Sequence, residues 1–300
     1  MRSVIVLLAL LLVAATEPAP RRWGFMGHEM AAAAATTVLP SEMPAFFRDG
    51  GDQLVYLNPE PDRWRSRDLA AMDQAWSYDH YVDMENVPPG AMDAPDRYEF
   101  LAILYENGLE KPERDAGFLP YRIVEMYERL VTEWRMWRNP RSPELRPFIE
   151  ARILNDAGIL GHYVTVATQP HHTTIHFNGW AEGEENPENY TDDRGFHSRF
   201  ERFFVEAHVQ QEDVDARVQD APVSVAGNAR AAVWSHIQEA HTHVETLYRL
   251  DRDFGFDPEG ESHPETRVFA ADRLAAGSRM LATLWWSAWQ ESANAPGGDE

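Results

Sequence analysis

The chain has 300 residues, which suits one large domain or two small ones. Hydrophobic residues make up 44% of it, enough for a sizeable core and unlike a disordered or fibrous chain. It has no cysteine, which excludes disulfides, zinc–thiolate sites and thiol nucleophiles. The formal net charge of −22 opposes unaided binding of nucleic acid. Any metal must be held by His, Asp, Glu or backbone groups, all of which zinc accepts.

An apolar run over residues 4–15 follows Arg2 at the start of the chain. The run is too short to span a bilayer, and its charged start and the small residues after it are typical of a secretory signal peptide. We therefore expect residues 1–22 to be a signal peptide with a short pro-segment, and the protein to be secreted or periplasmic. No later segment is long and apolar enough to cross a membrane, so we expect no stable membrane insertion. No protein partner is indicated.

Beyond residue 22 the apolar residues recur at helical spacing, without an alternating strand pattern of any length. Gly and Pro lie mostly between the periodic segments. This pattern predicts an all-α fold, with a single multi-helix domain over 23–292 and a disordered tail over 293–300. A polar, Asn- and Gly-rich loop is expected over 173–194. The expected helices span 27–39, 68–84, 98–109, 119–138, 144–167, 196–209, 228–251 and 265–292.

Potential metal ligands follow one another along the chain, each in a distinctive local sequence. A single His is more often a structural hydrogen-bonding residue than a ligand, but an ordered series favours a metal site. The series consists of His28 after Trp-Gly-Phe-Met-Gly, Asp62 in Asn-Pro-Glu-Pro-Asp-Arg, His80 in Tyr-Asp-His-Tyr-Val-Asp, His162 in Gly-His-Tyr-Val, His172 in Gln-Pro-His-His, and His197 with Glu201 in His-Ser-Arg-Phe-Glu.

In the order of the ligands and in the local sequence around each, this series resembles the zinc-dependent phospholipase C and single-strand-specific nuclease superfamily. The resemblance covers most of the chain beyond residue 22. The resemblance implies an all-helical fold, three zinc ions and cleavage of a phosphodiester bond. Such cleavage needs a nucleophile at neutral pH, neutralisation of the phosphate charge and help for the leaving oxygen. Zinc supplies all three because it acidifies water and polarises phosphoryl oxygens.

The resemblance also implies a role for each member of the series. Asp62, His80 and His162 would hold the first ion and act in catalysis. His172, His197 and Glu201 would hold a second ion, and because His197 and Glu201 lie four residues apart they share a helix face.

A third ion would be held by His28 together with the amino group and carbonyl of Trp23, which requires cleavage after Arg22. Substrate contacts are implied for Asn178 and His176, in the loop after His172. For Asn178-Gly179 an ordinary turn is an equally good interpretation, and for His176 the alternative is no functional role.

Two positions depart from the family pattern. The helix that carries His162 should offer a bridging aspartate one turn later, but Val166 stands there and has no lone pair to donate. Asp156 is a poor substitute because it lies six residues before His162, roughly 240° around the helix. His171 stands where the family usually has an apolar residue. The ten-residue spacing from His162 favours His172 as the ligand, with His171 as a rival.

Without the bridging carboxylate, we expect one or two zinc ions rather than three. The leading hypothesis is an exported zinc-dependent phosphodiesterase acting on single-stranded nucleic acid or on phospholipid. The substrate class stays open, because the acidic charge leans against a nuclease and no apolar loop that would dock on lipid is evident. The alternative is a degenerate, non-catalytic relative that binds metal or an anion. A purely structural helical protein is a third interpretation.

Overall fold

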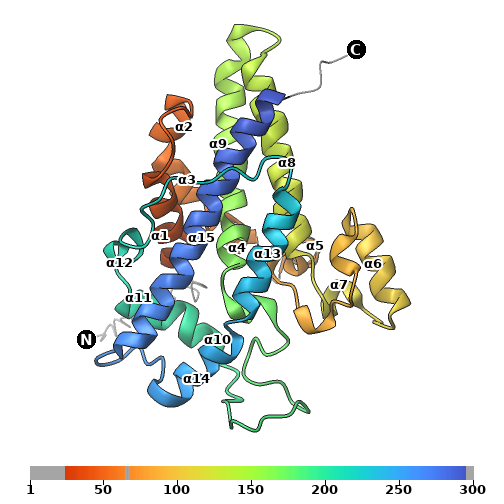
Figure 1. Cartoon of the computed structure of the whole chain (residues 1–300), viewed down its shortest axis with the longest axis vertical. Coiled ribbons are helices and arrows are strands. Elements are labelled where there is room, and N and C mark those ends of the chain that lie inside the picture. Colours follow the sequence, from red (N-terminus) through yellow and green to blue (C-terminus); the bar gives the residue numbers. More distant parts are fainter. Residues whose placement is uncertain (1–23, 65, 67, 295–300) are drawn as a thin grey trace, which may run out of the picture.

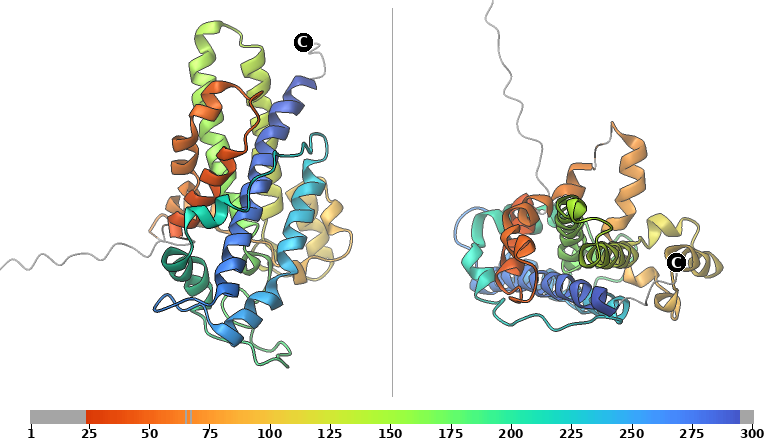
Figure 2. Two further views of the ribbon diagram at one scale, coloured as in Figure 1. Left: turned by 60° about the vertical axis from the view of Figure 1, so that its left-hand side comes forward. Right: turned by 90° about the horizontal axis from the view of Figure 1, so that it is seen from above.

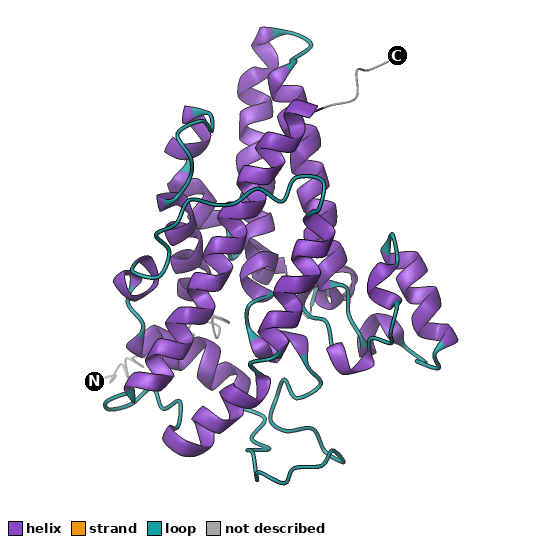
Figure 3. Cartoon of the chain, viewed as in Figure 1, coloured by secondary structure: helices purple, strands orange, loops and turns teal. Residues whose placement is uncertain are grey.

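The computed structural model describes residues 24–64, 66 and 68–294, and this part of the chain is all helical (Figures 1 and 3). No strand occurs among these residues, only an isolated bridge between Phe177 and Gly179. The expected all-α class is therefore confirmed. The expected signal peptide and pro-segment, together with Trp23, lie outside the described residues. The expected tail lies outside them from residue 295 onward, while a short 3-10 helix, η7 (Ser292–Asn294), closes the described part.

Three long helices run along the longest axis of the molecule (Figure 1). They are α8 (Leu119–Arg138), α9 (Arg146–Val166) and α15 (Pro264–Glu291). Proline stands in the first turn of each, where its missing N–H costs no helical hydrogen bond. At the start of α15, His263 also accepts the Glu265 N–H. These helices bury large aromatic side chains against one another, including Trp134 and Trp285.

Shorter elements surround this core. Before α8 lie α1 (Gly24–Thr37), α2 (Ala45–Asp49), α3 (Gly51–Leu57), α4 (Glu60–Trp64), α5 (Ala70–Ser77), η1 (Tyr78–His80), η2 (Met84–Asn86), η3 (Ala91–Asp93), α6 (Arg97–Glu106) and α7 (Pro112–Asp115). After it come η4 (Pro143–Leu145), η5 (Pro170–Thr173), α10 (Phe196–Ser198), the π-helical η6 (Arg199–Phe204), α11 (Val205–His208), α12 (Gln211–Asp215), α13 (Ala229–His241) and α14 (Val244–Phe254).

The structure differs from the predicted helices in two segments that later matter for the site. The expected helix over 68–84 stops at His80, and the chain continues extended so that the Val82 N–H reaches the His172 carbonyl at 2.9 Å. The expected helix over 228–251 is interrupted between α13 and α14. In both segments the apolar spacing persists through the break, so periodicity alone could not locate it. Helices α2, α3 and α4 were not predicted.

Small residues allow the first helices to pack closely against α9. A Cβ atom at Gly158 would lie 2.5 Å from Leu57 Cβ, and one at Gly161 would lie 2.5 Å from Asn58 Nδ2. Glycine at both positions therefore lets the end of α3 approach the middle of α9. This contact brings Asn58 next to the helix turn that carries His162. None of the helices among the described residues is both long and apolar enough to cross a membrane.

A buried pair of carboxyl groups joins α8 to α9. Glu133 and Asp156 are 2% and 3% exposed, and two arginines reach them from the rim. Arg152 approaches Glu133 at 2.8 Å, and Arg129 approaches Asp156 at 2.5 Å. Burial, followed by the neighbouring Asp156, raises the pKa of Glu133 to about 8. Glu133 therefore keeps its proton at neutral pH, while the pair gives Asp156 a role in helix packing.

This pair predicts a pH dependence of folding stability. The folded-state pKa of Glu133 lies above its unfolded value of 4.5. The contribution of Glu133 to folding stability is therefore complete below pH 4.5 and is lost as the pH rises through about 8. The loss amounts to roughly 1.4 kcal/mol per unit of pKa difference. Urea unfolding of the metal-free protein between pH 5 and pH 9 should show this decline in stability, and Glu133→Gln should make the slope shallower. The exposed Glu128→Gln on the same helix is the control, and equal slopes for all three proteins would contradict the assignment.

Candidate metal centre

Two groups of potential metal ligands converge in the structure. In each group, one ligand atom from each of three residues lies within 4.8 Å of the other two. The first centre consists of His28, Asp62 and His162, and the second centre consists of His172, His197 and Glu201.

The first centre is assembled by three elements, α1, α4 and α9. The rings of His28 and His162 stack, with centroids 4.2 Å apart. Asn58 Oδ1 lies 2.9 Å from His28 Nδ1 and is placed to accept its proton, which leaves the lone pair of His28 on Nε2. Burial lowers the pKa of His28 to about 3, against the opposing effects of the Asn58 hydrogen bond and the charge of Glu201. His28 is therefore neutral at pH 7, as a metal ligand must be.

This grouping differs from the one implied by the family resemblance. Asp62 and His162 were expected to share an ion with His80, but they converge with His28. His80 lies next to the group, edge-on to His162 with ring centroids 5.1 Å apart. Its Nδ1 is 2.8 Å from the Trp76 carbonyl and donates to it, so the lone pair of His80 is on Nε2.

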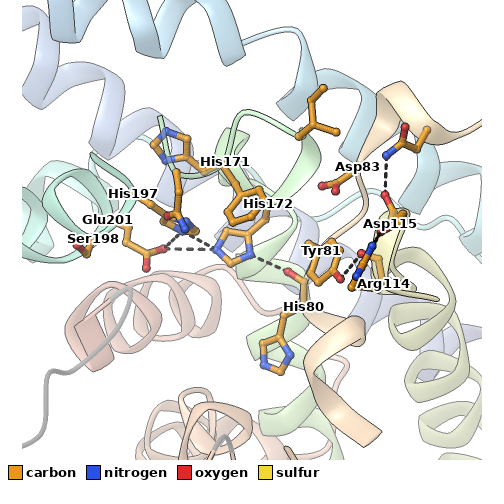
Figure 4. A pocket seen from close by; sticks show the side chains of 14 residues that line it. His80, Tyr81, Asp83, Arg114, Asp115, His171, His172, His197, Ser198 and Glu201 are labelled. Carbon is orange, nitrogen blue, oxygen red and sulfur yellow. Dashed lines mark hydrogen bonds and ion pairs between the residues drawn. The ribbon is translucent and has the colours of Figure 1, made fainter. Parts of the chain in front are cut away.

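In the second centre the three side chains point toward one another (Figure 4). His197 Nε2 lies 2.9 Å from Glu201 Oε2 and 3.1 Å from His172 Nε2. The Nδ1 of His172 donates to the His80 carbonyl at 2.6 Å, which leaves the lone pair of His172 on Nε2, facing the other two residues. Burial opposes ionisation of Glu201, but His197 and His172 outweigh it and lower the pKa of Glu201 well below its usual range. The carboxylate is therefore ionised.

His171 does not belong to the converged atoms of the second centre. Its backbone N–H donates to Gln169 Oε1 at 2.9 Å, and its ring meets Phe196 edge-on with centroids 4.8 Å apart. Burial lowers the pKa of His171 well below its usual value. His171 is thus a neutral packing residue beneath the centre, and His172 is the member of the pair that faces His197 and Glu201.

A cavity of about 700 Å³ opens beside the second centre (Figure 4). Asn178 lines it, whereas His176 does not. The His176 ring stacks on Trp180 at 3.8 Å and its Nδ1 accepts the Ala181 N–H at 2.9 Å. His176 therefore stabilises the loop rather than facing the cavity. The complete lining is His80, Tyr81, Asp83, Asn86, Arg114, Asp115, His171, His172, Ile175, Phe177, Asn178, His197, Ser198 and Glu201.

Sequence reasoning missed the acidic wall of this cavity. Asp83 is 7% exposed, and its carboxyl group has no hydrogen bond or ion pair with the described residues. Burial, together with Glu85 and Asp115, raises the pKa of Asp83 to about 8, so it is protonated at neutral pH. The sequence did contain a pattern that could have identified Asp83, because Asp83 is the last residue of the Tyr-Asp-His-Tyr-Val-Asp segment that identified His80. Asn58 was also missed, since no local pattern connects it to His28.

The position of the missing bridge is apolar. Val166 is 2% exposed and belongs to the main hydrophobic core. Asp156 does not replace the missing carboxylate, because it is held in the α8–α9 interface by Arg129. Among the described residues, the potential ligands form two three-residue groups.

Both centres fit zinc chemically. Each provides two imidazoles and one carboxylate, which is the donor set and number common in catalytic zinc sites with an open position. The neutral, buried His28 and the ionised Glu201 are in the protonation states that metal binding requires. Asn58 and the His80 carbonyl fix ring orientations from behind, as outer partners do in such sites.

Comparisons with known proteins give little further information. No family model and no curated protein matches the chain. Among solved structures, it is similar to α-toxin of Clostridium perfringens from the avian strain SWCP, with a TM-score of 0.40 and 14% sequence identity. The match covers 91% of this chain and 65% of the toxin, so the chain spans just under two thirds of the toxin's length. The all-helical fold of the described residues between 24 and 294 is given by the helices of the structure itself.

Proposed function

We propose that this chain is an exported zinc-dependent phosphodiesterase with one or two ions. The observation that carries the proposal is the convergence of two His–His–carboxylate groups, one of them beside a cavity large enough for a small substrate. Ligand pockets of natural proteins commonly have volumes of roughly 300–1,000 Å³. Export is supported by the apolar run near the N-terminus, which lies outside the described residues.

In this proposal the chain's residues bind and orient, and zinc supplies the Lewis acidity and the acidified water for hydrolysis. His172, His197 and Glu201 hold one ion at the cavity, and His28, Asp62 and His162 hold the other. Asp83 keeps its proton and donates a hydrogen bond to a polar substrate group. Asn178, which also lines the cavity, offers both a donor and an acceptor. A phosphodiester of single-stranded nucleic acid or of a phospholipid is the substrate class.

The alternative is a metal-binding relative that does not hydrolyse. Val166 favours it, because an apolar side chain in the core cannot bridge two ions. In this case the centres would bind zinc, and the cavity would hold an anionic ligand without turnover.

The decisive experiment is hydrolysis by the zinc-loaded protein with a verified N-terminus. A simple aryl phosphodiester, single-stranded DNA and phosphatidylcholine are offered in parallel, and zinc content is measured on the same sample. Turnover of at least one substrate, abolished by a chelator and restored by zinc, is the expected result. Metal-loaded protein with no turnover of any substrate would exclude the phosphodiesterase and leave the alternative.

Because Val166 stands where the resemblance implies a bridging aspartate, introducing an aspartate there should increase zinc binding. Val166→Asp places a carboxylate one turn after His162, and the number of zinc ions per chain should rise. Val166→Asn is the matched control, since it has nearly the same shape but no negative charge. Metal content and thermal stability are measured for all three proteins. If the wild-type chain already binds three ions, the premise that the bridge is needed is wrong.

The two centres should respond to separate substitutions. Asn58→Ala removes the acceptor that orients His28 and should weaken one zinc site by about 10- to 100-fold. Glu201→Gln should weaken the other site and leave the first in place. Isothermal titration with zinc after chelation measures both affinities, and Gln53→Ala, exposed on α3 just before Asn58, is the control. Loss of both sites from either variant, with the helical spectrum intact, would show that the centres are not independent.

A further inference from the structure

The end of the α8–α9 hairpin concentrates positive charge on an acidic protein. The hairpin tip, residues 135–148, contains four arginines and one glutamate, a net charge of +3 in a chain of −22. The arginines of these two helices that form ion pairs among the described residues lie further down, at Arg122, Arg129 and Arg152. No described carboxylate pairs with the tip arginines, which are Arg135, Arg138, Arg141 and Arg146.

Exposed apolar side chains lie among these arginines. Phe148 is 70% exposed, Met136 45% and Leu145 40%. They come from the last turn of α8, from η4 and from the first turn of α9, so folding brings them to one end of the hairpin. Single exposed apolar residues are ordinary, but three at one hairpin end beside the exposed Arg141 are typical of an interaction surface.

The hairpin tip is held in place by its own contacts. The guanidinium of Arg146 lies over the Trp137 ring at 4.6 Å and joins the two helix ends. Arg138 donates to the Trp289 carbonyl at 2.7 Å and to Ser292 Oγ at 2.8 Å, which fixes the hairpin to the end of α15. The exposed side chains therefore project from a hairpin end whose position is fixed by these contacts.

The hairpin tip also stands at one end of the longest axis, above the shorter helices (Figures 1 and 2). A flat surface can approach it there without first meeting α2 or α13. The cavity is lined from η1, η5 and the α10 segment, and α10 lies toward the other end of the molecule (Figure 1).

We infer that the hairpin tip docks on an anionic phospholipid bilayer. Arginines attract acidic headgroups, and apolar side chains among them enter the boundary with the acyl chains. A second copy of the chain is a poorer partner for tip-to-tip contact, because unpaired arginines would face one another. A nucleic-acid strand would match the arginines but offers nothing to the aliphatic Met136 and Leu145. Docking in this way does not depend on the proposed hydrolysis.

The experiment is co-sedimentation of the full chain, after removal of any signal peptide, with phosphatidylglycerol-containing vesicles and with pure phosphatidylcholine vesicles. The wild-type protein should bind the anionic vesicles, bind the neutral ones much less, and dissociate as salt is raised. Each arginine adds roughly a factor of five to partitioning on an anionic surface. Arg141→Glu, which also reverses the charge, should therefore reduce binding by more than about fivefold. Phe148→Ser should reduce binding as well.

Arg267→Glu and Val268→Ser are the matched controls, because both side chains are exposed on α15 near its other end. These controls should bind vesicles like the wild type. Equal vesicle binding by the tip variants and the controls would overturn the inference, as would no binding of the wild type. If the wild type and the controls bind a single-stranded oligonucleotide but not vesicles, and the tip variants do not bind the oligonucleotide, the surface would be assigned to nucleic acid instead. Hydrolysis of a soluble phosphodiester by the tip variants is measured in parallel and should be unchanged, so failure of docking and failure of catalysis are distinguishable.

Discussion

One pair of hydrogen bonds joins the parts of the candidate site. The His80 carbonyl accepts from His172 Nδ1 at 2.6 Å, and the His172 carbonyl accepts from the Val82 N–H at 2.9 Å. Through them the end of η1 and the turn η5, ninety-two residues apart in the chain, form one unit. The ring of His80 lies beside the first centre, while its carbonyl orients a ligand of the second. The helix that was expected to continue to residue 84 must end at His80 for this carbonyl to be available.

Burial and the neighbouring groups together set the charge state of the residues around this unit. His28 is neutral because burial lowers its pKa, and Glu201 is ionised because His197 and His172 outweigh the opposing effect of burial. Asp83 has no such partner and keeps its proton. The site therefore combines basic nitrogen donors, one strong carboxylate and a neutral acid within one region, although the chain as a whole is strongly acidic.

The packing of α9 is what places the first centre. Because Gly158 and Gly161 have no side chain, the end of α3 packs directly against the backbone of α9. This contact brings Asn58 to His28. Val166, one turn after His162, faces the apolar core rather than a second ion. The same helix thus provides a ligand to one candidate centre and an apolar core residue one turn later.

The sequence by itself determined the helical class, the long helices α8 and α15, and the order of the candidate ligands, because helical periodicity and local motifs are recorded along the chain. It also showed that His197 and Glu201 share a face. Only the tertiary structure decided that His28 joins Asp62 and His162, that His172 rather than His171 faces the second centre, and that Asn58 and Asp83 belong to the site. It also located the breaks after His80 and His241 and gathered Phe148 with the tip arginines. These features depend on contacts between residues distant in the chain, and close packing and burial of charge are properties that no local pattern contains.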